Sequence, residues 1–86
     1  MPMNLNILYF ASLREALGMA REAVVLPGDI ATVGALRAHL SERGNAWQRL
    51  GPGHNVKAAV NQQMATDAQP LASGDEVAFF PPVTGG

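Results

Sequence analysis

The chain has no cysteine and only one lysine, Lys57, among its 86 residues. Without cysteine it forms no disulfide, no thiolate zinc site and no cysteine nucleophile, and this composition fits a reducing compartment. Six basic residues are balanced by seven acidic ones, and neither sign gathers into a block. A nucleic-acid-binding surface would need a basic stripe. The sequence therefore excludes a disulfide scaffold and gives no indication of nucleic-acid binding.

Long apolar runs are also missing. No stretch approaches the roughly 20 apolar residues that a membrane span needs, and the N-terminus lacks the pattern of a secretory signal. We therefore expect a soluble, cytoplasmic protein that acts without nucleic acid or membrane. Because 48% of the residues are hydrophobic, the chain has enough apolar surface for a single compact domain, which at this length hides about 60 to 65% of its surface.

Short apolar segments predict a sheet of five strands with two helices packed on one of its faces, an α+β fold in one domain. The strands are expected at residues 4–10, 21–26, 56–60, around 63–65 and at 76–80. A short first helix is predicted from Ser12 and Glu15, which have the spacing of a capping box, and Gly18 is expected to end it.

The main helix is expected to begin after Thr32, a good N-cap, and to run to about Arg43 before Gly44 stops it. Its apolar stripe, which faces the sheet, consists of Val33, Leu36 and Leu40. The residues expected largely on its other side are Arg37, Ser41 and Glu42. Residues 44–55 are predicted to form a loop that Trp47 and Leu50 pin to the core.

The C-terminal residues 74–86 begin as a turn, become a strand and leave that strand as an uncharged tail. After Glu76 no side chain is charged, so the α-carboxylate of Gly86 is the only charge at that end. Pro81 and Pro82 donate no backbone N–H and fix φ, which ends the strand and holds the chain extended. We therefore expect a domain at residues 1–80 and an extended tail at residues 81–86.

The tail has the form of an extended terminal segment that delivers a carboxyl group into the pocket of another protein. Fully stretched, it reaches roughly 20 Å. Gly85 and Gly86 have no Cβ, so a partner can close around them and approach the terminal carbonyl from either face. A frayed terminus is the usual fate of the last few residues, but a strand and two prolines directly before the glycines favour a functional end.

No self-contained active site is expected in the rest of the chain. His39 and His54 have no further ligands at a recognisable spacing, so a metal site is not predicted. Asp75 and Glu76 are adjacent and would point to opposite faces of a strand, which prevents their acting as an acid–base pair. Ser12 has no histidine near it in sequence. The carboxyl terminus is therefore the candidate reactive group.

Four segments carry a resemblance to a known family: residues 9–15, 32–37, 59–62 and 75–86. The last, Asp-Glu-Val-Ala-Phe-Phe-Pro-Pro-Val-Thr-Gly-Gly, is the most specific. In these segments the sequence resembles the small, sulphur-carrying subunits of molybdopterin synthases, which are ubiquitin-like β-grasp proteins. The similarity covers most of the chain, and residues 44–55 lie outside it.

The resemblance implies a sulphur carrier that binds no cofactor itself. An adenylating enzyme would use ATP to activate Gly86, and a sulphur donor would convert the adenylate into a thiocarboxylate. The tail would then enter the large synthase subunit, where the sulphur passes to cyclic pyranopterin monophosphate. The family assembles as a heterotetramer of two small and two large subunits, with the catalytic side chains on the large one.

The residues expected to contact the large subunit lie at the end of the last strand and along the tail: Phe80, Pro81, Pro82, Val83, Thr84 and Gly85. Side chains alternate along a strand. Val77 and Phe79 are therefore expected to face the main helix, with Ala78 and Phe80 on the opposite face. Phe80 then lies beside the root of the tail, where an exposed aromatic ring is suited to anchor a partner.

Two other functions are compatible with a glycine-ended β-grasp protein. One is sulphur delivery to another pathway, such as thiazole synthesis or transfer-RNA thiolation, whose carriers lack the Phe-Phe-Pro-Pro-Val-Thr segment. The other is an interaction module whose terminus is never modified. Co-purifying partners separate the first from a molybdopterin carrier, and the mass of the C-terminal peptide separates a carrier from a module.

Overall fold

The computed structural model describes residues 2–51 and 55–81. In chain order the elements are β1 (Met3–Tyr9), α1 (Ala11–Leu17), β2 (Arg21–Leu26), α2 (Val33–Ser41), the 3-10 helix η1 (Asn45–Leu50), β3 (Lys57–Val60), β4 (Gln63–Ala65) and β5 (Glu76–Phe80). The predicted strands and helices are thus confirmed, with some ends shifted by one or two residues.

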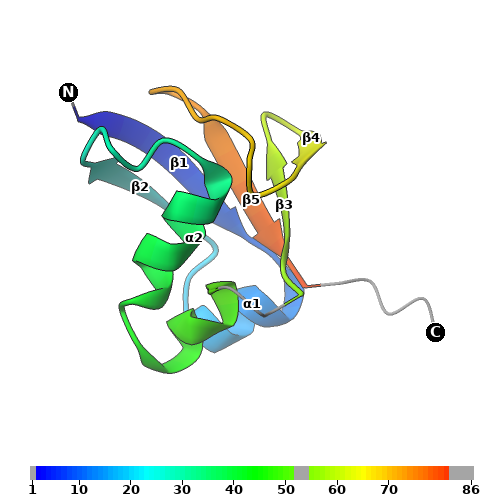
Figure 1. The fold of residues 1–86 in the computed structure, drawn as a ribbon. Helices are drawn as coiled ribbons and strands as arrows, with labels where there is room; N and C mark the ends of the chain where they lie inside the picture. The colour runs from blue at the N-terminus through cyan, green and yellow to red at the C-terminus, as the bar shows by residue number, and fades with distance from the viewer. Residues whose placement is uncertain (1, 52–54, 82–86) are drawn as a thin grey trace.

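The strands form one mixed sheet in the order β2-β1-β5-β3-β4 (Figure 1). β5 runs parallel to β1 and antiparallel to β3, while the two outer pairs are antiparallel. The first and last strands of the chain therefore lie side by side, and β5 is the middle strand of the sheet. Because β5 is hydrogen-bonded on both sides, the point where it ends at Phe80 is held firmly.

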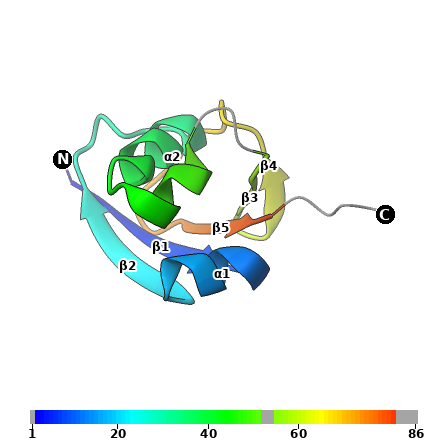
Figure 2. The ribbon, with the colours of Figure 1, turned by 90° about the horizontal axis from the view of Figure 1, so that it is seen from below.

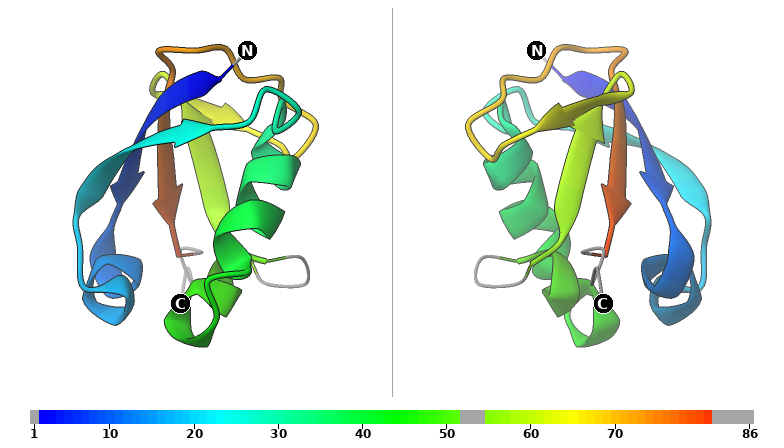
Figure 3. Two further views of the ribbon diagram at one scale, coloured as in Figure 1. Left: turned by 90° about the vertical axis from the view of Figure 1, so that its left-hand side faces the viewer. Right: turned by 90° about the vertical axis from the view of Figure 1, so that its right-hand side faces the viewer.

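Helix α2 lies across one face of the sheet (Figures 2 and 3). As predicted, Val33, Leu36 and Leu40 are fully buried there. The strand residues buried in the same core are Met3, Leu5, Ile7, Tyr9, Leu26, Ala58, Val60, Val77 and Phe79. Helix α1 lies at the end of the sheet where β1 stops (Figure 1), and its Leu13 joins this core. Both helices therefore pack into a single core.

The predicted ends of the helices are confirmed at two positions. The hydroxyl oxygen of Thr32 accepts a hydrogen bond of 3.1 Å from the backbone N–H of Ala35, which caps α2. Gly18 ends α1 in the left-handed conformation, with φ 77°, which costs glycine little because it has no Cβ. Helix α2 ends at Ser41, two residues before the expected Arg43.

The capping box predicted for α1 is wrong. The N-cap is Phe10, no side chain caps this end, and Ser12 is the second residue of the helix. The chain enters the helix from the sheet, because the N–H of Phe10 donates to the carbonyl oxygen of Phe79 at 3.1 Å. The carbonyl of Phe10 then accepts from the N–H of Leu13 at 3.1 Å. This pairing with β5, which is distant in sequence, sets the start of the helix before Ser12.

Arg37 was expected on the outer side of α2, and this is also wrong. Only 8% of Arg37 is exposed. Its guanidinium group donates to the carbonyl oxygens of Leu50 at 2.8 Å and Gly51 at 3.2 Å, and forms an ion pair with Asp67 at 2.8 Å. Arg37 is thus buried because it satisfies backbone carbonyls that the core would otherwise leave without a donor.

Part of the loop expected at residues 44–55 is ordered as η1. Leu50 is fully buried and Trp47 is half-buried against the core, which confirms both as apolar contacts of this connection. The expected turn at residues 51–53 falls partly outside the described residues.

Candidate functional site at the end of strand β5

The tail starts where β5 ends, between the ends of two neighbouring strands. Phe79 lies opposite Tyr9 of β1 and Ala58 of β3, and Phe80 lies opposite Lys57 at the start of β3. Pro81, the next residue, is half-buried. It has no N–H to continue the sheet pairing, so the chain leaves the sheet there. The predicted site residues Pro82, Val83, Thr84, Gly85 and Gly86 lie outside the described residues.

The predicted assignment of the two faces of β5 is confirmed. Val77 and Phe79 are fully buried in the core, whereas Ala78 and Phe80 are half-buried on the opposite face. Phe80 therefore faces away from the core directly before the tail, but it is half-buried and not exposed as expected. Phe10, which leads from β1 into α1, is 46% exposed close by, since its N–H is bonded to Phe79.

A cluster of aromatic rings packs against β5 on the core face of the sheet. The Phe79 ring stacks on the Tyr9 ring with the ring centroids 6.3 Å apart, and the Tyr9 and Trp47 rings form an edge-to-face pair with centroids 5.4 Å apart. The guanidinium carbon of Arg43 lies 4.4 Å from the centroid of the Trp47 ring, a favourable cation–π distance. These rings connect β1, β5 and η1, so the end of β5, where the tail begins, is packed firmly against its neighbours.

Polar side chains form hydrogen bonds at the edge of this aromatic cluster. The Tyr9 hydroxyl donates a hydrogen bond of 2.8 Å to Glu22, and Arg43 forms an ion pair with the same carboxylate oxygen at 2.7 Å. Burial raises the pKa of the Tyr9 hydroxyl well above its usual range, and the hydrogen bond to Glu22 raises it further. Tyr9 therefore stays neutral at physiological pH and acts as a structural donor, because burial disfavours the charged phenolate.

On the face that carries Phe80, apolar side chains form a row across four strands. Leu8 lies opposite Ala78, Ala78 opposite Ala59, and Ala59 opposite Met64. Paired residues share a face of the sheet, and Met64 at the end of the row is 67% exposed. We call these four residues and Phe80 the apolar row. The sequence placed Phe80 and Ala78 on this face, whereas Leu8, Ala59 and Met64 join them only through the strand register.

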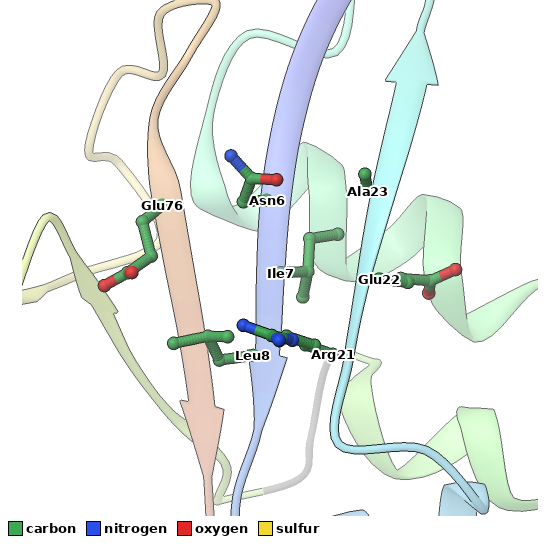
Figure 4. A pocket seen from close by; sticks show the side chains of 7 residues that line it. All are labelled: Asn6, Ile7, Leu8, Arg21, Glu22, Ala23 and Glu76. Carbon is green, nitrogen blue, oxygen red and sulfur yellow. The ribbon is translucent and has the colours of Figure 1, made fainter.

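A shallow hollow lies beside the apolar row on the same face. Its volume is about 530 Å³, and it is lined by Asn6, Ile7, Leu8, Arg21, Glu22, Ala23 and Glu76. In Figure 4 the Arg21 side chain extends from β2 across β1, where Arg21 pairs with Leu8. The hollow thus adds the cation of Arg21 and the carboxylate of Glu76 to this face, which also carries the exposed Lys57 opposite Phe80.

The described residues hold little else that supports chemistry. No group of three or more histidine, aspartate or glutamate side chains among them is placed to hold a metal ion. His39 is half-buried on α2, and His54 lies outside the described part. Asp75 accepts from the N–H of Ala72 at 2.8 Å and from the Asn61 amide at 3.0 Å, and these bonds hold the turn that leads into β5.

Within residues 2–51 and 55–81, no helix has the length and apolarity to cross a membrane.

Comparison with known families decides the relationship. The sequence model described as "ThiS family" matches residues 7–86, which is most of the chain and includes both terminal glycines. The chain belongs to the ThiS family. The matched region contains β5, the apolar row and the entire tail.

Two curated relatives are similar over nearly the whole chain, and both are called molybdopterin synthase sulfur carrier subunit. The protein of Haemophilus influenzae is 42% identical over 82 residues, which are 95% of this chain and 99% of that protein. The Escherichia coli protein is 43% identical over 82 residues, with the same coverage of 95% and 99%.

Solved structures agree with the fold. SAMP1 from Haloferax volcanii superimposes with a TM-score of 0.77 at 31% identity, covering 96% of this chain and 99% of that one. A chain from the complex of subunits 1 and 2 of the molybdopterin-converting factor from Helicobacter pylori gives 0.64 at 22% identity, covering 98% and 100%. The ubiquitin of Caldiarchaeum subterraneum gives 0.62 at 19%, covering 100% of both chains. The fold is therefore a ubiquitin-like β-grasp.

Proposed function

We propose that this protein is the sulphur carrier of a molybdopterin synthase. The observation that carries the proposal is the identity of 42–43% with two molybdopterin synthase sulfur carrier subunits over 95% of the chain. The structure adds a second argument. Its last strand is held at the centre of the sheet, so a tail starting at Pro81 begins from a fixed position.

The reactive group in this proposal is the carboxyl terminus of Gly86. A carboxylate acylates poorly because its oxygen leaves badly, and transfer to the phosphate of ATP on an adenylating enzyme creates a good leaving group. A sulphur donor then displaces AMP and leaves a thiocarboxylate. In this proposal the chain itself needs no cofactor, and it has no cysteine to intercept the adenylate.

The acceptor in the proposal is cyclic pyranopterin monophosphate, bound by the large synthase subunit. The thiocarboxylate sulphur attacks the pterin precursor there, and two such transfers supply both sulphurs of the dithiolene. The large subunit provides the catalytic side chains, and two copies of each subunit form a heterotetramer. The H. pylori complex of subunits 1 and 2 supports a partner of this kind. A cytoplasmic location remains a prediction that accompanies this role.

The apolar row is the surface that fits the large subunit best. It adjoins the root of the tail, so a partner that receives the tail also covers Phe80 and its neighbours. Apolar side chains that lie together at a surface mark interaction sites more often than scattered ones do; in this row Met64 is exposed and the other four residues are half-buried. Phe80 is the central anchor, because buried aromatic side chains dominate the binding energy of most interfaces. The tail residues Pro81, Pro82, Val83, Thr84 and Gly85 continue the contact toward the active site.

The position of Gly86 at the very end provides the test. Purified large subunit, the pterin precursor, the adenylating enzyme with ATP and a sulphur source are combined with three forms of this chain. These are the natural chain, a chain without Gly86 and a chain with one alanine added after Gly86. We expect molybdopterin from the natural chain only, with equal melting temperatures for all three because the described domain is unchanged.

Molybdopterin formation by the extended chain, with the extra alanine shown by mass to persist, would contradict the proposal. Failure of all three chains, including the natural one, would contradict it as well, provided that the E. coli relative is active in the same mixture.

A further inference from the structure

Three charged side chains share the face of the sheet that carries the apolar row. They are Arg21 on β2, Lys57 on β3 and Glu76 on β5. Each is paired with a residue of this face, in the same order Leu8, Phe80 and Asn6. On this face the strands therefore carry two cations and one carboxylate, an excess of positive charge, although the formal charge of the whole chain is -1.

The two cations lie on either side of the apolar row. Arg21 continues the row by one strand beyond Leu8, and Figure 4 shows its guanidinium group over β1. Lys57 lies two residues before Ala59 on β3 and opposite Phe80. Residues paired in this way have Cβ atoms roughly 4.5–5.5 Å apart, so Lys57 directly adjoins the proposed anchor. A protein that covers the row from Leu8 to Phe80 therefore meets both cations.

Neither cation is neutralised within the described domain. Arg21 and Lys57 are exposed, and no carboxylate in residues 2–51 and 55–81 lies within ion-pair distance of either side chain. In Figure 4 the Glu76 side chain extends from β5 to the side away from β1, so its carboxylate does not shield Arg21. Both positive charges are thus available to a protein that docks on this face.

A partner on this face has to provide for the two cations. Taking an ammonium or guanidinium group out of water is strongly unfavourable unless a counter-charge or hydrogen-bond acceptors replace the water. A purely apolar partner surface would lose at Arg21 and Lys57 much of what it gains on the apolar row. A carboxylate opposite each cation removes this cost. Complementary charges also fix the register of two surfaces and raise the rate of association.

We propose that the large synthase subunit binds this face through an apolar centre flanked by two carboxylates, one facing Lys57 and the other facing Arg21. The identity of the partner rests on the function proposed above, whereas the acidic flanks of its surface follow from the charges on this face. The same charges disfavour a second copy of the chain as the occupant. Two such faces together would place four cations in one interface with only two carboxylates to pair with them.

The rate and strength of binding to purified large subunit test the charge at Lys57. Binding is followed by biolayer interferometry at low ionic strength and at about 0.15 M salt, where the Debye length is about 8 Å. At low ionic strength Lys57→Glu should raise Kd by about tenfold or more, mainly through slower association. The neutral variant Lys57→Gln should raise Kd less, by about threefold. At the higher salt concentration both differences should shrink.

Arg49→Glu is the matched control. Arg49 is exposed on η1, whose Leu50 packs into the core on the α2 side of the sheet. Its reversal changes the net charge of the chain by the same amount as Lys57→Glu but leaves the open face unchanged. It should alter Kd by less than about twofold, because charges farther apart than a Debye length are largely screened. Melting temperatures should stay close to that of the natural chain, since each replaced residue is exposed.

Carbodiimide cross-linking of the complex identifies the partner's carboxylate. The reagent joins an amine to a carboxylate in contact with it, with loss of water, and Lys57 is the only lysine of the chain. We expect a fragment in which Lys57 is joined to an aspartate or glutamate of the large subunit. Changing that acidic residue to lysine should weaken binding of the natural chain and restore binding of Lys57→Glu, because the exchanged charges form the pair again.

Equal changes in Kd for Lys57→Glu and Arg49→Glu would overturn the inference, and the proposed function would stand because the natural chain still binds. A natural chain that does not bind the large subunit at all would contradict the proposed function and overturn the inference with it. Sedimentation showing that the natural chain forms a dimer, which Lys57→Glu dissociates, would assign this face to a second copy and overturn the inference as well.

Discussion

Phe79 and Phe80 are adjacent and chemically identical, yet the structure assigns them different tasks. Phe79 is fully buried and stacks on Tyr9. Truncating such a side chain removes its transfer free energy and leaves a cavity, so Phe79→Ala should lower the free energy of unfolding by about 3–5 kcal/mol. For an 86-residue domain such as this one, each kcal/mol corresponds to roughly 4–8 °C in melting temperature.

Phe80 is half-buried on the other face. Full burial of a phenylalanine stabilises a fold by about 1.5–3 kcal/mol relative to exposure, so Phe80→Ala, which removes an incompletely buried side chain, should cost less than that and leave no closed cavity. Its effect should appear in binding instead. As an anchor in the interface, Phe80 should contribute on the order of 2 kcal/mol or more, which is about a 30-fold increase in Kd.

Thermal melts of both variants, with calorimetric titrations against the large subunit, measure the two effects. Val25→Ala is the matched control, since Val25 is 66% exposed on β2 and far from the tail, and it should change neither quantity much. Unchanged affinity for Phe80→Ala would refute its role as an anchor. A larger loss of stability for Phe80→Ala than for Phe79→Ala would refute the assignment of the two faces.

Three further predictions concern the domain and its tail. Arg37→Met should lower the free energy of unfolding, measured in urea, by about 2–4 kcal/mol, because the carbonyls of Leu50 and Gly51 lose a buried donor. The control Arg49→Met, at an exposed position, should change this free energy by no more than about 0.5 kcal/mol. Equal losses for the two variants would contradict the role of Arg37. Since the pKa of Tyr9 is raised in the folded state, the unfolded chain loses the tyrosine proton first, and stability should fall as the pH rises above about 10. Tyr9→Phe should flatten this alkaline decline in pH-dependent melts, and an unchanged slope would show that another group causes it. Gly85→Leu should slow sulphur transfer while the melting temperature stays nearly constant, and a large drop in melting temperature would show that the tail packs on its own domain.

The parts of the fold that depend on local pattern were predictable. The spacing of Val33, Leu36 and Leu40 identified the buried face of α2, and the alternation along residues 76–80 identified the buried side of β5. Thr32 and Gly18 act through their own short-range geometry, so the sequence was sufficient there as well.

The two wrong predictions, the cap at Ser12 and the outer position of Arg37, have a common physical cause, which is contact between distant parts of the chain. Ser12 does not cap α1, because the bond from Phe10 to Phe79 starts the helix earlier. Arg37 is buried because the carbonyls of Leu50 and Gly51 and the carboxylate of Asp67 meet it there. One signal was available, since Arg37 follows Val33 by four residues and precedes Leu40 by three, and therefore lies on the apolar stripe.

The candidate site was predictable to different degrees. Phe80 followed from alternation along one strand, whereas its apolar neighbours required the order of five strands and their register. The terminal glycines stood out because no charge follows Glu76 and no Cβ hinders the last two residues.

The central claim is that Gly86 carries sulphur, and the intact mass of the C-terminal peptide tests it most directly. The chain is isolated from cells that are making molybdopterin, under conditions that preserve thiocarboxylates, and compared with the chain from cells without the adenylating enzyme. We expect a fraction of the first sample in which one carboxyl oxygen of Gly86 is replaced by sulphur, and none in the second. A peptide that carries only the ordinary carboxylate in both samples, with the E. coli relative modified in the same cells, would contradict it.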